Sequence, residues 1–181
     1  MPSTWKTSLA FDMKLPGDID FTVEGIYSRD YNPVVVSNTG YKPSETTVTL
    51  APGDVRNTYT MYSDATWRNK YQNVYLLENW KKGAYYYSIS AQLRKNFDFG
   101  LDVSFAYTHS KARSYSDGIG DQVTSAYKTN TYSVNGINEH ELGYGTYVAP
   151  DRVLATIGYR KEYGKHFATS VSLLYLSLIH I

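Results

Sequence analysis

The chain has 181 residues, no cysteine and a formal net charge of +1, and charged side chains make up 19% of it. Disulfides and thiolate metal sites are therefore excluded, and the charge balance provides no field that would attract nucleic acid. The 19 tyrosines, together with many β-branched and small polar residues, favour strands. No window of the sequence approaches the ~18 apolar residues that a transmembrane helix needs.

The N-terminal segment alternates apolar and polar side chains with a period of two residues. Such alternation predicts a strand with one apolar face. Pro16-Gly17-Asp18 predicts a tight turn, because proline fixes φ and glycine accepts positive φ. A second alternating segment follows, so residues 5–29 are predicted to form a hairpin. Its apolar face comprises Leu9, Phe11, Met13, Leu15, Ile19, Phe21, Val23 and Tyr27.

Two further pairs of alternating segments repeat this design. One covers residues 84–108 and turns at 98–100, and the other covers residues 152–175 and turns near 163–165. Each pair predicts an antiparallel hairpin with one apolar and one polar face. The apolar faces comprise Tyr85, Tyr87, Ile89, Ala91, Leu93, Phe97, Leu101, Val103, Phe105, Tyr107, Val153, Ala155, Ile157, Tyr159, Thr169, Val171, Leu173 and Tyr175. The polar faces of the three hairpins carry the charged residues Lys14, Asp20, Glu24, Arg94, Asp102 and Arg160.

The connections between the strands alternate strictly between short and long. The three turns span a few residues each, whereas the connections 30–83 and 109–151 are very long. A compact soluble domain rarely tolerates a structureless loop beyond ~15 residues, but outer-membrane barrels combine tight periplasmic turns with long extracellular loops. We therefore expect an all-β, antiparallel, up-and-down transmembrane β-barrel, of which this chain supplies about six strands. Within the first loop, residues 73–79 are expected to pair with the start of the next strand, turning at 80–83.

Alternation alone fits a soluble β-sandwich equally well, because the apolar face would then point inward. Aromatic residues at both ends of the strands favour the membrane, since Tyr and Trp prefer its interfaces. At the long-loop ends these are Trp5, Tyr27, Tyr85, Tyr87 and Tyr107, and at the short turns they are Phe97, Phe99, Tyr159, Tyr163 and Phe167.

The sequence carries no motif typical of catalysis or metal binding. His109, His140 and His166 lack paired spacing or an HExxH motif and are predicted to be solvated loop histidines. Residues 117–121 lack the alternating ligands and closing Glu of a calcium loop, so a turn is predicted there. No G-x-S-x-G elbow occurs, and we expect no enzyme activity, no cofactor and no metal site.

Aromatic residues of the long connections are expected either to stack on a ligand or to pack the loops against one another. They are Tyr41, Tyr59, Tyr62, Trp67, Tyr71, Trp80, Tyr115, Tyr127, Tyr132, Tyr144 and Tyr147.

The two ends of the chain carry little functional information. The first residues have neither the basic start nor the apolar stretch of a secretory signal. The last six, LSLIHI, follow a strand without a turn and resemble a translated transposase-adapter sequence. Residues 176–181 are therefore interpreted as a sequencing artefact, and His180 receives no role.

Four segments occur in a recognisable order: residues 2–9 leading into KLPGD at 14–18, then 21–30, 86–101, and APDRV at 149–153. Together they resemble the C-terminal part of the barrel in Bacteroidota-type TonB-dependent receptors, over most of residues 1–175. The resemblance implies a barrel of ~22 strands around a plugged lumen. It also implies energised import of a glycan, a peptide or a metal chelate across the outer membrane.

The same resemblance implies a set of partners. These are the outer-membrane lipid, a plug domain of the same protein, the TonB complex, a surface lipoprotein and the imported ligand, but no nucleic acid. Two other classes stay open: a secreted β-sandwich that acts as an adhesion or carbohydrate-binding module, and a small complete barrel such as a phospholipase. Recovery of the protein in buffer without detergent would favour the sandwich.

Overall fold

The computed structural model describes residues 1–61, 73–116, 122–129, 133, 135–136, 138–145, 147–164 and 166–179. Strands account for 71% of the described residues, so the fold class is all-β and antiparallel, as predicted from the composition and the alternation. The chain divides into two compact units. Unit 1 comprises Met1–Trp5, Arg29–Tyr85 and Arg113–Tyr147, and unit 2 comprises Lys6–Ser28, Tyr86–Ala112 and Val148–Ile181.

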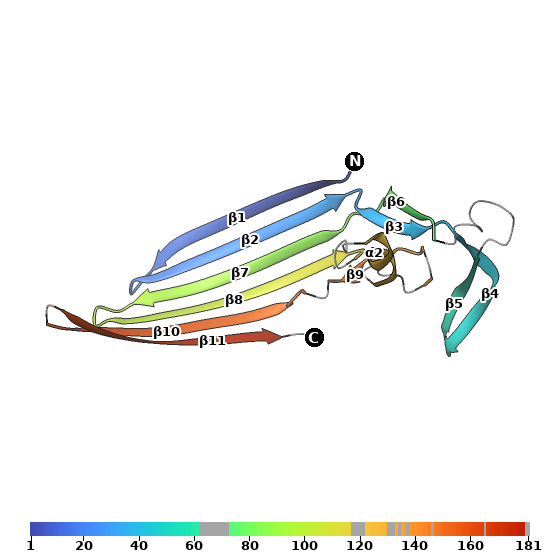
Figure 1. The fold of residues 1–181 in the computed structure, drawn as a ribbon. Helices are drawn as coiled ribbons and strands as arrows, with labels where there is room; N and C mark the ends of the chain where they lie inside the picture. The colour runs from blue at the N-terminus through green and yellow to red at the C-terminus, as the bar shows by residue number, and fades with distance from the viewer. Residues whose placement is uncertain are drawn as a thin grey trace. The chain divides into compact units, whose positions relative to one another are not determined.

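The main sheet follows the order of the chain, β1-β2-β7-β8-β10-β11 (Figure 1). The three predicted hairpins correspond to β1–β2, β7–β8 and β10–β11. Among the described residues the sheet is not closed, and β1 and β11 are its outermost strands. The bounds are β1 Ser3–Leu15, β2 Ile19–Tyr31, β7 Tyr85–Asn96, β8 Leu101–Ser114, β10 Asp151–Tyr163 and β11 Phe167–Ile179.

The short turns depend on residues with positive φ. Gly17, Gly100 and Gly164 have φ values of 83°, 93° and 60°, one in each hairpin turn. Gly100 is also confined by its neighbour, because a Cβ there would lie 2.1 Å from the carbonyl oxygen of Arg160. The Arg160 amide in turn donates to the Gly100 carbonyl over 2.9 Å. The second hairpin turn therefore lies directly against β10.

The register of β8, β10 and β11 tests the predicted faces. Residues opposite one another in an antiparallel ladder share a face. Ala155 of β10 lies opposite Phe105 on one side and Tyr175 on the other. Ile157 likewise lies between Val103 and Leu173. The alternation of each strand therefore aligns its apolar set on one common face of the sheet, and this prediction is confirmed for the three strands.

The last strand departs from simple alternation. Leu174 lies opposite Thr156, and Leu176 lies opposite Leu154, on the polar face. Since Leu173 and Tyr175 lie on the other face, β11 carries apolar side chains on both faces. The paired strand continues to Ile179, and it therefore includes part of the segment that was interpreted as an artefact.

The two long connections contain regular structure. Strand β3 (Val34–Asn38) pairs with β6 (Tyr75–Asn79), and β4 (Tyr41–Ala51) pairs with β5 (Asp54–Met61). The second connection holds the helix α2 (Val123–Thr129) and the short strand β9 (Gly143–Tyr144). Strand β9 pairs with the end of β8, where Arg113 lies opposite Tyr144.

The predicted partner of residues 73–79 is wrong. Strand β6 pairs with β3 rather than with the start of β7. The reason lies in the link between β6 and β7, which runs beside the end of β2 and does not fold back. The Asp30 amide donates to the Ala84 carbonyl over 2.9 Å, and the Trp80 amide donates to the Pro33 carbonyl over 2.8 Å. Asn32, with a φ of 53°, and Pro33, which has no N–H, separate β2 from β3.

The buried apolar residues that the structure describes all belong to unit 1. They are Val35, Val36, Ala84, Tyr115 and Ala126. The ring of Trp80 meets that of Tyr115 edge-on, with the centroids 6.4 Å apart. In the described part of the chain, no helix combines the length and apolar character needed to cross a bilayer.

Candidate functional site

The apolar face of the main sheet is open to its surroundings. On β11, Val171 and Leu173 are each 67% exposed, and Leu9 on β1 is 80% exposed. Soluble monomers rarely leave such large contiguous apolar patches uncovered. The face therefore marks a contact surface for an apolar partner. Its other exposed members are Phe11, Met13, Ile89, Leu93, Phe105, Tyr107, Ile157, Tyr159 and Tyr175.

The short-turn ends of this face combine aromatic rings with lysines. The rings of Phe97 and Phe99 lie 5.3 Å apart, and the Lys95 ammonium lies 4.6 Å from the centre of the Phe97 ring. The Lys161 ammonium lies 5.7 Å from the centre of the Tyr163 ring. A lysine stem can cover apolar surface while its ammonium stays in a polar medium. The arrangement suits a boundary between an apolar and an aqueous phase.

The opposite face of the sheet carries polar side chains that pair with one another. Lys14 lies 3.8 Å from Asp20, and the Ser104 and Thr156 hydroxyls form a hydrogen bond of 2.6 Å across β8 and β10. Gly158 makes room for a neighbouring carboxylate, because a Cβ there would lie 2.3 Å from Oδ1 of Asp102. This face is suited to water or to polar protein surface.

A buried polar network joins the two long connections within unit 1. The Ser37 hydroxyl donates to Oε1 of Glu78 over 2.6 Å, and its oxygen lies 2.9 Å from Nε2 of His140. Because Ser37 has a single proton, its oxygen accepts the Nε2 proton of the histidine, which leaves Nδ1 as a bare acceptor. Burial lowers the pKa of His140, although Glu78 and Glu139 act in the opposite direction.

This network corrects the prediction that His140 is solvated. The residue is 7% exposed, and the Trp80 ring meets the imidazole edge-on with the centroids 5.1 Å apart. The predicted location of His109 is also wrong, because His109 lies within β8 and not in a loop. Its Nδ1 lies 2.9 Å from Oδ1 of Asp151. His166 lies in the turn before β11, as expected, and is exposed.

The serine and histidine do not have the geometry of a hydrolytic triad. In such a triad the carboxylate holds the histidine through Nδ1, whereas Glu78 contacts the serine instead. Ser37 is only 6% exposed, so a substrate cannot reach its oxygen. The network therefore has a structural role, which is to connect β3, β6 and the segment around residue 140.

An amide pair extends the same connection. The Asn38 amide donates to Oδ1 of Asn138 over 2.7 Å, and Nδ2 of Asn138 donates to the Asn38 carbonyl over 2.9 Å. The Asn38 side chain, 1% exposed, accepts from the amides of Gly40 and Val74. The two asparagines imitate a rung of a β-ladder, and they fix residue 138 against the end of β3.

Beside this pair lies a cavity of about 370 Å³. Asn38, Asn73 and Asn138 contribute to its walls, together with His140 and with Tyr127 and Lys128 of α2. Burial raises the pKa of Tyr127 to about 12. Within the described residues, the hydroxyl of Tyr127 and Nδ1 of His140 are both buried without a hydrogen-bond partner. We refer to this space as the amide cavity.

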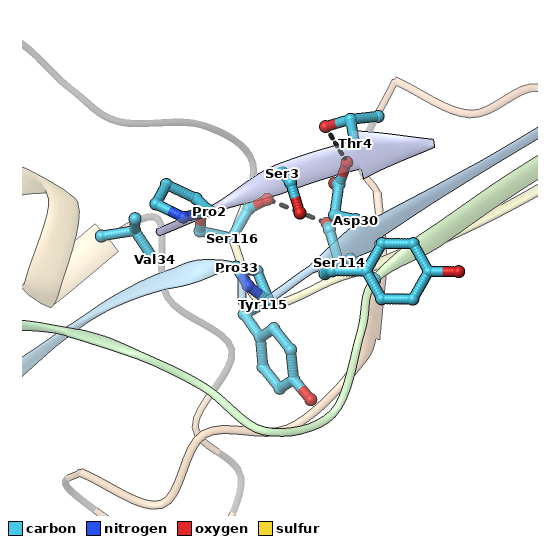
Figure 2. Close-up of a pocket in the computed structure, with 11 residues that line it drawn as sticks. Pro2, Ser3, Thr4, Asp30, Pro33, Val34, Ser114, Tyr115 and Ser116 are labelled. Carbon is cyan, nitrogen blue, oxygen red and sulfur yellow. Dashed lines mark hydrogen bonds between the residues drawn. The ribbon is translucent and has the colours of Figure 1, made fainter. Parts of the chain in front are cut away.

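A second cavity, of about 440 Å³, lies where the ends of β1, β2 and β8 meet in unit 1 (Figure 2). Thr4 donates to Asp30 over 2.7 Å, and Ser114 donates to the Ser116 carbonyl over 2.9 Å. Tyr115 borders the same space (Figure 2). Beside these two bonds, the hydroxyl of Tyr115 is buried and has no hydrogen-bond partner among the described residues.

The sequence singled out only part of this arrangement. Among the loop aromatics, Trp80 and Tyr115 pack inside unit 1, whereas Tyr144 and Tyr147 are 57% and 90% exposed. No local pattern in the sequence distinguishes Ser37 from the other serines. Residues 117–121, Tyr62, Trp67, Tyr71, Tyr132 and His180 lie outside the described residues.

No cluster of three or more histidine, aspartate or glutamate side chains suited to a metal ion occurs where the structure is described. Comparison of the chain with protein-family models, with curated proteins and with solved structures gave no match.

Proposed function

We propose that this chain is a wall segment of a TonB-dependent outer-membrane transporter of the Bacteroidota type, which imports a nutrient. The observation that carries the proposal is the exposed apolar face of the main sheet, which runs in register across β8, β10 and β11. Acyl chains cover such a face when the strands lie in a bilayer.

The lengths of the elements support the same proposal. The six long strands of the main sheet contain 12 to 14 residues, which is enough to cross a bilayer at a tilt. The turns between them are tight, whereas the links from β2 to β7 and from β8 to β10 contain strands and a helix. Outer-membrane barrels have this asymmetry, with the elaborate connections outside the cell.

The polar face of the main sheet is consistent with the wall of a barrel lumen. Its hydroxyl pair and its charged residues would meet water or a plug domain inside a larger barrel. In this role the elaborate connections capture a glycan, a peptide or a metal chelate before it enters the lumen. The outer-membrane lipid, the plug of the same protein, the TonB complex and a surface lipoprotein are the proposed partners.

The absence of cysteine permits a direct test by labelling single introduced cysteines. Leu173→Cys and Ile157→Cys report on the apolar face, and Ser172→Cys and Thr156→Cys are matched controls one residue away on the other face. Each cysteine is labelled with an environment-sensitive fluorophore in outer-membrane vesicles from cells that produce the protein. Brominated lipids should quench the labels at 173 and 157, and aqueous iodide should quench those at 172 and 156.

A β-sandwich would give a different pattern. The labels at 173 and 157 would then be shielded from both quenchers by a second sheet, and the protein would stay in the soluble fraction without detergent. That result would overturn the transporter proposal and favour the secreted adhesion or carbohydrate-binding module.

A further inference from the structure

The same three-residue pattern occurs where β7 and β10 end at their short turns. It is a lysine, a polar residue and an aromatic residue: Lys95-Asn96-Phe97 at β7 and Lys161-Glu162-Tyr163 at β10. The lysine ammonium lies 4.6 Å from the ring centre in the first and 5.7 Å in the second. Both lysines continue the apolar series of their strands, two positions beyond Leu93 and Tyr159, so they lie on the apolar face. We call Lys95, Phe97, Lys161 and Tyr163 the basic rim.

The rim lysines have no carboxylate partner in the protein. Within the described residues, neither ammonium lies within 4.0 Å of an aspartate or glutamate oxygen. The neighbouring Glu162 instead lies 2.9 Å from Arg160, which belongs to the polar face. In the apolar series of the six described long strands, Asp151 is the single carboxylate. It stands at the long-loop end and pairs with His109 over 2.9 Å, so the short-turn end carries positive charge alone.

A bilayer that covers the apolar face would supply the missing anion. A lysine can lay its stem along apolar surface while its ammonium reaches the polar boundary. At that boundary the anions are the phosphates of the lipid headgroups, and an ammonium can donate up to three hydrogen bonds to their oxygens. The aromatic rings of the rim favour the same depth and stabilise the neighbouring cation.

A headgroup fits this surface better than a small soluble anion does. Strand β8 separates β7 from β10, so the two strands lie about 10 Å apart, and each lysine stands beside apolar side chains rather than in a pocket of polar groups. A soluble anion would therefore meet one ammonium at a time. A lipid is held there in addition by its acyl chains, which can lie against Leu93 and Ile157, both exposed on the apolar face.

We propose that the basic rim selects anionic glycerophospholipids, with Lys95 and Lys161 each donating to a headgroup phosphate. A zwitterionic lipid is bound less well, because the cation of its own headgroup offsets the charge of the phosphate. The inference rests on the proposed function for the placement of this face in a membrane. In that placement the short turns are periplasmic, so the selected lipids belong to the inner leaflet of the outer membrane.

The test measures which lipid lies beside each rim lysine. Single cysteines at Leu93→Cys, next to Lys95 in the apolar series, and at Val171→Cys, opposite Tyr159 on β11, carry an environment-sensitive fluorophore. The full chain is placed in phosphatidylcholine vesicles that contain a minor fraction of acyl-brominated phosphatidylglycerol or of acyl-brominated phosphatidylcholine. Quenching at both labels should report an enrichment of the anionic lipid of about fivefold, the expected contribution of one lysine at a charged interface. Leu9→Cys is the control label, because the apolar series of β1 contains no lysine, and the two lipids should quench it equally.

Substitutions assign the preference to the individual lysines. Lys161→Gln should abolish the lipid preference at position 171 and leave that at position 93, whereas Lys161→Arg should retain both. Lys14→Gln is the matched control, because Lys14 stands at the same end of the sheet on the polar face, 3.8 Å from Asp20. It should change neither preference.

Three results would overturn the inference: equal quenching by the two lipids at positions 93 and 171, an equal loss of preference in Lys14→Gln and Lys161→Gln, or competition by inorganic phosphate beyond that of sodium chloride at the same ionic strength. The last result would assign the lysines to a soluble anion. In the first case both lipids still quench, so the proposed function stands and only the headgroup preference falls. Quenching of no label by either lipid would remove the proposed function together with the inference.

Discussion

The turn at Gly100 allows the packing of the second hairpin against β10 to be tested with a single methyl group. In Gly100→Ala the new Cβ would lie 2.1 Å from the Arg160 carbonyl oxygen, at a φ of 93°. Positive φ costs an alanine about 1–2 kcal/mol. The turn and β10 must also separate by about 1 Å to reach an ordinary contact distance, which weakens the 2.9 Å bond from Arg160 to Gly100. Losing that bond costs about 1 kcal/mol.

Gly164→Ala provides the matched control. Gly164 also has a positive φ, 60°, but no atom lies within 4 Å of its added Cβ. The free energy of unfolding of Gly164→Ala should therefore fall only by the backbone contribution of about 1–2 kcal/mol, whereas that of Gly100→Ala should fall by about 2–3 kcal/mol in total. Urea unfolding in micelles, followed by tryptophan fluorescence, measures both losses. Equal losses in the two variants would refute the close approach of the turn to β10.

Three further changes test other parts of the molecule. Burial lowers the pKa of His140 in the folded protein, so the unfolded chain binds a proton first and the free energy of unfolding should fall as the pH drops below about 6.5. His140→Gln should flatten this pH dependence between pH 7.5 and 5.5. An unchanged slope in the variant would contradict the assignment of the pH dependence to His140. Tyr127→Phe removes an unpartnered buried hydroxyl and should leave the protein as stable or up to about 1 kcal/mol more stable, so a clear loss in urea unfolding would indicate a partner for that hydroxyl. Gly158→Ala should destabilise the folded protein, because the added Cβ would lie 2.3 Å from the Asp102 carboxylate, whereas the Cβ added in Gly25→Ala has no atom within 4 Å. Thermal unfolding of the two variants should show a lowered midpoint for Gly158→Ala and an unchanged one for Gly25→Ala.

The sheet was predictable because its signal is local. In β8 and β10 large apolar residues recur at every second position, with Leu154 as the exception on the polar face, and a period of two maps directly onto the two faces of a strand. The turn at Gly17 has an equally local signature, since the preceding proline and the glycine both restrict the backbone to turn conformations. Face and turn could therefore be inferred without knowing which strands are neighbours.

The amide cavity was not predictable for the opposite reason. Ser37 and His140 are 103 positions apart, and Asn38 and Asn138 are 100 apart. Only the folded arrangement of two long connections brings these residues together, and nothing in the composition around His140 distinguishes a buried histidine from a solvated one. The partner of β6 was wrong on similar grounds, because the choice depended on how residues 80–84 run beside Asp30.

The outermost strands of the main sheet have a practical consequence for handling the protein. β1 and β11 each run for 13 residues, and within the described part of the chain each pairs with another strand along one side only, which leaves one row of amides and carbonyls at each margin of the sheet. In hydrocarbon every such group costs several kcal/mol, and in water a long unprotected row serves as a template for additional chains. In buffer without detergent, the isolated polypeptide should accordingly polymerise through its outermost strands, and adding strands that pair with β1 and β11 should return it to discrete particles.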